Sequence, residues 1–283
     1  MNSGDAPSPR LAAVILTRNE ARDIADCVRS CAFADKVVVL DSNSTDDTAA
    51  LAGSAGAEVH MREFTNYADQ RNVGLALVAD FEWVLMMDAD ERVPDDMAAE
   101  VRKVVESTPA DVVLFRIRRK DFFFGRWLRR ATGYPTWAGR LMRPIRVHFT
   151  RDINEELVAH GETAFLQTHF HHFPFSKGVA AWFERHNSYS TMEAARLYEE
   201  RSARLRMPAG SLRDPAARRR LAKQLFYRLP MRPWIAFLGL YVLRGGFLDG
   251  WPGLQYCRLR SIYEYMIELK MRERTFLEKT RAP

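Results

Sequence analysis

The first 120 residues contain short apolar runs that alternate with stretches patterned like helices, and this alternation most constrains the fold. Apolar runs with the length of a buried strand occupy Leu11–Leu16, Lys36–Leu40, Glu58–Met61 and Trp83–Met87. Helix-like stretches lie between and after them, at Ile24–Cys31, Asp47–Ala55, Tyr67–Val78 and Pro94–Ser107, and Val112–Ile117 is a further predicted strand. Strand, helix and strand repeated with short links predict a parallel, doubly wound α/β sheet.

Polar residues follow three of these strands at the point where each strand ends. Thr17-Arg18-Asn19-Glu20 follows the first strand, Asp41-Ser42-Asn43-Ser44 the second, and Asp88-Ala89-Asp90 the fourth. Ligands of open α/β sheets bind at the carboxyl ends of the strands, so these residues outline one pocket. Two aspartates spaced i, i+2 suit a divalent cation that also holds substrate phosphates. A surface turn that closes the strand is the alternative interpretation.

Four motifs in this region together resemble those of the family 2 glycosyltransferases, and in particular the branch that builds lipopolysaccharide cores and exopolysaccharides. In chain order they are L-T-R-N-E, V-V-L-D-S-N-S-T-D-D-T, Y-A-D-Q-R-N-V-G-L and M-D-A-D-E-R. The resemblance implies a GT-A fold, which is a Rossmann-like, mostly parallel sheet with flanking helices, and a nucleotide-sugar donor, with a UDP-sugar favoured. The donor contacts that it implies are Thr17, Arg18, Glu20, Asp41, Ser44, Arg71, Asp88, Ala89 and Asp90. It also implies that Asp88 and Asp90 hold Mn²⁺ or Mg²⁺, which offsets the charge of the departing nucleoside diphosphate.

The segment further along the chain supplies candidates for a catalytic base and a third metal ligand. An inverting sugar transfer needs a carboxylate that deprotonates the acceptor hydroxyl. Arg151-Asp152-Ile153-Asn154-Glu155-Glu156-Leu157 resembles the family's V-H-E-K-L element, which puts the base at Glu155, with Glu156 as the fallback. Adjacent glutamates on a strand point to opposite faces, so only one of them can face the pocket. Similarity to the family's H-x-P-F-S-K-G pattern implies a third metal ligand at His172 and a donor-phosphate contact at Lys177.

The residues from 201 to 283 are strongly basic, with 18 Lys and Arg against 6 Asp and Glu, although the whole chain carries a net charge of only +6. This balance predicts a polyanionic partner. A membrane surface is favoured over nucleic acid because no zinc-finger spacing or aromatic RNA-binding signature accompanies the charge. The apolar run Pro233–Leu243 is about half as long as a membrane-spanning helix. We therefore expect helices that lie in the membrane surface with basic flanks, and helices that pack on the catalytic domain are the alternative.

These patterns predict three parts of the chain. Residues 1–10 form a flexible tail, residues 11–200 a GT-A catalytic domain, and residues 201–283 a basic helical extension. Within the catalytic domain, residues 11–120 are expected to bind the nucleotide sugar, and residues 121–200 to bind the acceptor and supply catalysis. Three cysteines without a disulfide framework, and a polar start without a signal peptide, are typical of a cytoplasmic protein. We expect it at the inner face of the cytoplasmic membrane.

The predicted function is that of an inverting, metal-dependent glycosyltransferase that acts on a lipid-linked glycan or lipopolysaccharide-core acceptor. Transfer to polyprenyl phosphate is an alternative, because that acceptor is already ionised and needs no base. A non-catalytic GT-A scaffold in a glycan-assembly complex is the alternative from another class, and the Asp-x-Asp element with a candidate base argues against it. A nucleotidyltransferase is disfavoured because Thr17-Arg18-Asn19-Glu20 stands where its glycine-rich loop is expected.

Overall fold

The computed structural model describes residues 10–150, 156–201, 225–227, 229 and 231–281. The chain forms two compact units. The sheet unit contains residues up to Phe122 together with Tyr134–Ser176, and the helical unit contains Phe123–Gly133 together with the residues from Lys177 onward. The boundary expected at residues 200 and 201 lies at the end of helix α5 (Gly178–Arg201), and the two units divide between Ser176 and Lys177, because α5 packs with the later helices. The functional roles of the parts stay predictions.

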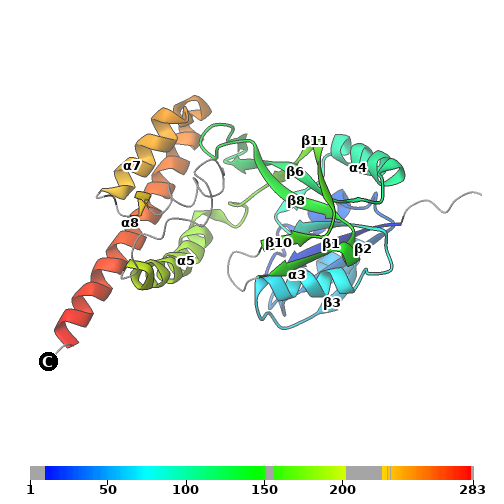
Figure 1. The fold of residues 1–283 in the computed structure, drawn as a ribbon, viewed down its shortest axis with the longest axis horizontal. Coiled ribbons are helices and arrows are strands. Elements are labelled where there is room, and N and C mark those ends of the chain that lie inside the picture. Colours follow the sequence, from blue (N-terminus) through cyan, green and yellow to red (C-terminus); the bar gives the residue numbers. More distant parts are fainter. Residues whose placement is uncertain (1–9, 151–155, 202–224, 228, 230, 282–283) are drawn as a thin grey trace, which may run out of the picture. The chain divides into compact units, whose positions relative to one another are not determined.

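A mixed, mostly parallel sheet forms the centre of the sheet unit (Figure 1). Eight of its nine strands follow one path, and they are β1 (Leu11–Thr17), β2 (Lys36–Asp41), β3 (Glu58–Met61), β4 (Trp83–Asp88), β5 (Glu91–Arg92), β6 (Val112–Phe123), β8 (Thr136–Met142) and β11 (Glu162–His172). They lie in the order β3-β2-β1-β4-β8-β6-β11-β5. The first four run parallel, β8 enters antiparallel between β4 and β6, and β5 pairs antiparallel with β11. The predicted sheet class is confirmed, with an antiparallel strand in its middle.

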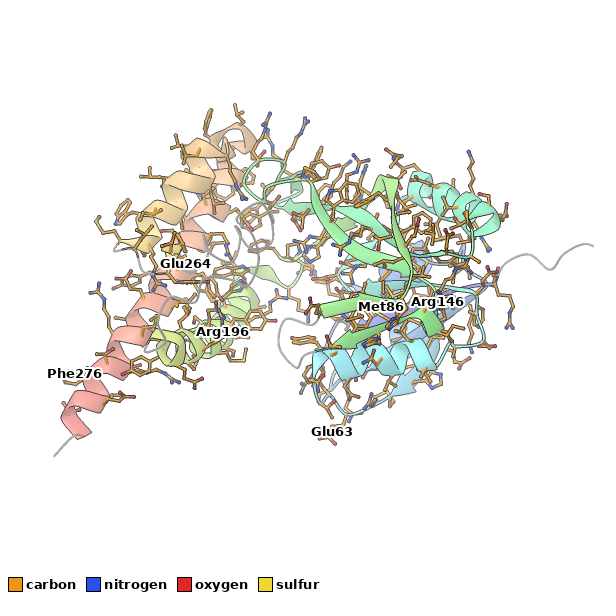
Figure 2. All side chains as sticks on the ribbon, viewed as in Figure 1. Glu63, Met86, Arg146, Arg196, Glu264 and Phe276 are labelled. Carbon is orange, nitrogen blue, oxygen red and sulfur yellow. The ribbon has the colours of Figure 1, made fainter. Side chains whose placement is uncertain are left out.

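Helices cover both faces of this sheet. They are α1 (Ile24–Ser30), α2 (Thr48–Ser54), α3 (Tyr67–Ala76) and α4 (Asp95–Ser107). Successive side chains of a strand point to opposite faces, so β1 contributes to two cores. Ile15 packs in the core that α1, α2 and α4 cover, and Val14 packs in the core that α3 covers. Met86 of β4 is fully buried in this second core (Figure 2).

Two residues of the Y-A-D-Q-R-N-V-G-L motif fix α3 in place. Gly74 lets the helix approach the sheet closely, because a Cβ atom there would lie 2.9 Å from Cγ1 of Val14. The side-chain amide of Asn72 donates to the carbonyl of Phe149 (2.9 Å) and accepts from its N–H (2.8 Å). Phe149 belongs to a two-stranded ribbon, whose elements are the turn η1 (Pro144–Arg146) and the antiparallel strands β9 (Val147–Thr150) and β10 (Glu156–Ala159).

The helical unit is built from two long helices and several short elements. They are β7 (Arg126–Trp127), α5 (Gly178–Arg201), α7 (Arg232–Leu238), the π-helical turn η2 (Gly239–Leu243), η3 (Gly246–Asp249) and α8 (Gly250–Arg281). Ala194 and Leu197 of α5 pack against Ile267 of α8, and Glu264 of α8 is buried within this unit (Figure 2). Across the described ranges, no helix has both the length and the apolar character to cross a membrane.

The segment Phe123–Gly133 belongs to the helical unit although it lies between β6 and β8 in the sequence. The Asp249 carboxylate accepts the backbone N–H groups of Arg129, Arg130 and Ala131 at 3.2, 2.8 and 2.7 Å. Asp249 is buried and accepts three backbone N–H groups, so it anchors the segment to η3.

Candidate functional site

The ends of β1 and β2 bring two buried polar side chains together. Thr17 and Asp41 are partners in the parallel register of these strands. Asp41 is fully buried, and its carboxylate accepts the backbone N–H and the hydroxyl of Ser44, both at 2.6 Å. The Thr17 hydroxyl is buried and has no hydrogen-bond partner among the described residues. A buried polar group without a partner marks a position where a polar ligand atom fits.

Backbone hydrogen bonds join the loops after β1 and β2 into one rim. The Asn19 N–H donates to Oγ of Ser44 (2.7 Å), and Oδ1 of Asn19 accepts the N–H of Thr45 (2.8 Å). Asn19 takes a φ of 53°, in the left-handed region that asparagine tolerates better than most residues. The Glu20 N–H donates to the Thr48 hydroxyl at 2.7 Å. Arg18 is exposed on this rim, and Glu20 is partly buried.

The first aspartate of the Asp-x-Asp element lies between two arginines. Oδ1 of Asp88 is 3.1 Å from Nη2 of Arg71, and Oδ2 is 2.6 Å from Nη2 of Arg140. Burial by itself raises the pKa of Asp88, but the charges of Arg140 and Arg71 outweigh it and hold this pKa well below its usual range. Asp88 is therefore an ionised carboxylate whose charge is already compensated by the protein.

The second aspartate lies beside the predicted histidine. Oδ2 of Asp90 is 3.5 Å from Nε2 of His172, and Nδ1–H of His172 donates to Oδ1 of Asp121 at 2.6 Å. The side chains of Asp90 and His172 are each 17% exposed. Burial disfavours the imidazolium form, but the hydrogen bonds to Asp121 and Asp90 outweigh it and raise the pKa of His172 to about 9. Asp121 thus orients the ring with its Nε2 toward Asp90, as carboxylates do behind metal-binding histidines, and a bound cation would replace the Nε2 proton.

Asp90 and His172 fit a divalent cation better than Asp88 does. A carboxylate and an imidazole are a plausible pair of ligands for Mn²⁺, and Mg²⁺ takes one or two carboxylates together with substrate phosphates. Asp88 instead bonds two guanidinium groups. In the described part of the chain, no three His, Cys, Asp or Glu side chains are arranged to hold a metal ion by themselves. The residues therefore suit a cation that also takes oxygen ligands from the substrate.

Glu91, which belongs to the M-D-A-D-E-R motif, and Arg140, which lies in the predicted acceptor-binding part, complete this region, although neither was predicted to contact the donor or the metal. Glu91 is 1% exposed, and its Oε2 accepts the backbone N–H of Asp88 at 3.0 Å. Its other oxygen bonds to Arg140. Burial raises the pKa of the Glu91 carboxyl to about 7, against the opposing charge of Arg140. The sequence offered one sign of this cluster, which is the arginine inside the mostly apolar run T-W-A-G-R-L-M. A charge in a buried strand needs a partner of opposite charge.

The remaining predicted residues are distributed differently. Ala89 is buried, and its N–H donates to the carbonyl of Leu16 at 3.3 Å. Glu155 lies outside the described residues, and Glu156 is the exposed first residue of β10. Lys177 belongs to the helical unit, so its contact with donor phosphate stays a prediction.

Comparisons with known proteins agree with the motifs. Residues 12–170 match the sequence model of the family described as glycosyl transferase family 2. An uncharacterised glycosyltransferase of Rickettsia felis is 35% identical over 103 residues, which cover 36% of this chain and 36% of that protein, so the match spans about a third of that relative. The lipopolysaccharide core biosynthesis glycosyltransferase LpsC of Rhizobium meliloti is 24% identical over an alignment of 289 positions, which covers 96% of this chain and 95% of that protein.

Solved structures show more distant similarity. Mannosyl-3-phosphoglycerate synthase from Rubrobacter xylanophilus is 18% identical, with a TM-score of 0.45 over 72% of this chain and 79% of that one. Glucosyl-3-phosphoglycerate synthase from Mycobacterium tuberculosis, in complex with Mn²⁺, UDP-glucose and phosphoglyceric acid, is 23% identical, with a TM-score of 0.35 over 40% of this chain and 44% of that one.

Proposed function

Because the chain belongs to glycosyl transferase family 2, we propose that this glycosyltransferase moves a sugar, with inversion, from a UDP-sugar to a lipopolysaccharide-core or other lipid-linked glycan. The observation that carries the proposal is the gathering of Asp41, Asp88 and Asp90 at the carboxyl ends of neighbouring parallel strands. Similarity to LpsC over nearly the whole chain supports the acceptor class.

The ends of β1 and β2 suit the nucleoside of the donor. The Asp41 carboxylate is held by Ser44, so one of its remaining lone pairs can accept an N–H from the nucleobase. The unpaired Thr17 hydroxyl lies in register beside it and supplies a second polar contact. Arg71 closes the other side of the pocket through its bond to Asp88.

Asp90 and His172 would hold the divalent cation, with Asp88, which bonds to Arg140 and Arg71, as the further predicted ligand. A bound cation stabilises the negative charge that develops on the leaving nucleoside diphosphate. Asp121 keeps the His172 ring oriented for this role. Lys177 adds a positive charge for the same phosphates in this proposal.

The acceptor hydroxyl would lose its proton to Glu155, with Glu156 as the fallback. Glu155→Gln is expected to abolish transfer while donor binding stays intact, because the amide cannot accept the proton. If Glu156→Gln loses transfer and Glu155→Gln does not, Glu156 is the catalytic base. Full activity in both variants would favour polyprenyl phosphate, which is already ionised, as the acceptor.

The helical unit supports a further part of the proposal, which is binding to an anionic membrane surface. Trp234, Leu238 and Val242 follow each other at four-residue spacing and are 62%, 52% and 51% exposed. Leu243 is 86% exposed, and the exposed Arg244 comes directly after it. Aromatic and aliphatic side chains next to basic ones are typical of helices that lie at a lipid surface.

Vesicle pelleting tests this membrane contact. Vesicles with anionic lipid should retain the wild-type protein at low salt and release part of it at high salt, because salt screens surface charges. Leu243→Ser should weaken retention. Phe276→Ser, which changes a side chain that is 65% exposed near the end of α8, serves as the matched control. Equal retention of both variants would contradict the assignment of this surface.

Calorimetric titration with UDP, with and without Mn²⁺, tests the central proposal. Wild-type protein should bind UDP more tightly when Mn²⁺ is present, and Asp90→Asn should lose this gain. Asp95→Asn, in the exposed first turn of α4, is the matched carboxylate-to-amide control and should behave like wild type. Absence of metal-dependent binding in the wild type would favour a non-catalytic scaffold. A panel of nucleotide sugars, assayed for donor hydrolysis, then identifies the sugar.

A further inference from the structure

An irregularity in β8 brings Arg140 to the Asp-x-Asp element. Leu141 pairs with Phe115 of β6, whereas Gly139 pairs with Arg116, so Arg140 is an extra residue in the ladder between the two strands. The register between β8 and β4 also ends at Leu141, which pairs with Leu85. A β-bulge of this kind changes the direction in which a side chain points, and bulges are frequent next to active sites.

The guanidinium of Arg140 connects two carboxylates of the β4–β5 turn. It bonds to Oδ2 of Asp88 at 2.6 Å and to Oε1 of Glu91. The other oxygen of Glu91 accepts the Asp88 N–H at 3.0 Å. Arg140 therefore contacts the Asp88 side chain, while Glu91, which it holds, contacts the Asp88 backbone. The Arg140 side chain is 9% exposed and lies over the ring of Phe170, and its partner Glu91 is 1% exposed, whereas the Asp88 side chain is 35% exposed.

We propose that Arg140 is a positioning residue of the donor site, which sets the orientation of the Asp88 carboxylate through a closed bracket of Arg140, Glu91 and Asp88. The proposal rests on the nucleotide-sugar function argued above, and it adds a positioning role in the donor site for Arg140 and Glu91. A side chain that holds a ligand-binding carboxylate within a fraction of an ångström preorganises the site for its substrate.

Stability alone is a weak reason for such a cluster. Buried ion pairs often contribute little to folding, because the cost of removing the charges from water offsets their attraction. Both bonds come from one guanidinium nitrogen, Nη2, which the planar group holds in place over the ring of Phe170. Lysine keeps the charge but not the planar group, and Arg140→Lys therefore separates geometry from charge.

The chain offers a matched control for this substitution. Arg143 directly follows β8, its side chain is 12% exposed, and it bonds to Glu82 at 2.6 Å and lies over the ring of Trp83. It is thus a second mostly buried arginine with a carboxylate partner and an aromatic contact, but its partners lie at the beginning of β4 rather than at its end. Arg143→Lys has the same chemistry at a position away from the Asp-x-Asp element.

Two measurements on the full chain test the proposal. The first is hydrogen–deuterium exchange in the segment that contains residues 88–92, which requires no nucleotide. The second is the dissociation constant of UDP without metal and with Mn²⁺, followed by KM and kcat where a donor is turned over. Glu91→Gln serves as a second variant if Arg140→Lys fails to fold. Glutamine has only one side-chain oxygen, so it can accept a hydrogen bond from Arg140 or from the Asp88 N–H, whereas the two oxygens of a carboxylate accept both.

We expect Arg140→Lys to speed exchange in this segment, to weaken UDP binding by about 10- to 100-fold and to raise the donor KM, as for groups that orient ligating residues. Arg143→Lys should do none of these. Unchanged exchange in residues 88–92 of Arg140→Lys would show that Arg140 does not hold this segment, which would overturn the proposal. Faster exchange with wild-type UDP affinity would reduce Arg140 to a structural role and overturn the positioning proposal. If the wild type itself binds no nucleotide, the proposed function fails, and the exchange result still decides whether the bracket exists.

Discussion

Replacement of Gly74 by alanine tests how closely α3 must approach the sheet. Alanine in a helix interior normally stabilises a protein by about 0.5–1 kcal/mol relative to glycine. At this position, however, the new Cβ would lie 2.9 Å from Cγ1 of Val14, closer than real Cβ contacts come. Val14 is fully buried in the middle of the sheet, and its β-branched side chain has little freedom to move aside.

The magnitude follows from these two opposing effects. An extra methyl group in a well-packed core costs about 1–3 kcal/mol. After the gain in helix propensity is subtracted, Gly74→Ala should destabilise the sheet unit by about 1 kcal/mol. Gly53→Ala is the matched control, because Gly53 lies in α2 with nothing within 4 Å of the added Cβ. That control should be neutral or stabilise by about 0.5 kcal/mol.

Thermal and urea unfolding of both variants measure this difference, which corresponds to a gap of roughly 3–6 °C in Tm for a unit of this size. UDP binding gives a second readout. Arg71 lies one turn before Gly74 on the same helix and bonds to Asp88 at 3.1 Å, so a displaced helix should also weaken nucleotide binding. If Gly74→Ala is as stable as Gly53→Ala, the close approach of α3 is not a real constraint and the reasoning fails.

Three further outcomes are expected. Asp90→Asn should lower metal-dependent transfer at least 100-fold while circular dichroism stays that of the wild type; retained activity would remove Asp90 from the cation site. The Glu100 carboxylate accepts the backbone N–H groups of Gln167 and Thr168, at 2.8 and 2.9 Å, where the register of β11 is irregular. Glu100→Ala should therefore lower the free energy of unfolding, measured with urea, by about 2 kcal/mol. A loss below about 0.5 kcal/mol would contradict this. Burial lowers the pKa of His186, which stacks on Trp182, from 6.5 to about 4. The unfolded state therefore binds more protons between these values, so stability is complete above pH 6.5 and falls toward pH 4. His186→Phe should make that acid loss shallower, and an unchanged pH profile would count against the assignment.

Local patterns in the sequence were sufficient to predict the strands of the parallel half of the sheet. Trp83–Met87 is a continuous apolar run because both faces of β4 are buried, and the polar residues after it mark the point where the strand leaves the core. The family motifs then correctly predicted the GT-A-like class of the fold. Arg71 was predicted to close the donor pocket, and the structure brings it to Asp88.

Long-range pairing explains what local patterns left out. β6 extends to Phe123, whereas the predicted strand ended at Ile117. The prediction stopped there because the charged run Arg118–Asp121 interrupts the apolar pattern of a buried strand. The antiparallel entry of β8 between β4 and β6 depends on contacts between distant residues, and so does the bulge at Arg140. Glu91 followed the Asp-x-Asp element as one more acidic residue, and only its contact with Arg140 gives it a role.

The segment Phe123–Gly133, held by Asp249, makes the helical unit discontinuous in the sequence. The backbone therefore passes between the two units three times, near residues 122, 133 and 176. A chimera that joins this sheet unit to the helices of a relative at one crossover near residue 177 would separate Asp249 from the three N–H groups that it accepts. Because the bonded groups belong to the backbone, exchange of the distal helices alone keeps this contact only where the incoming helices carry a carboxylate at the position of Asp249.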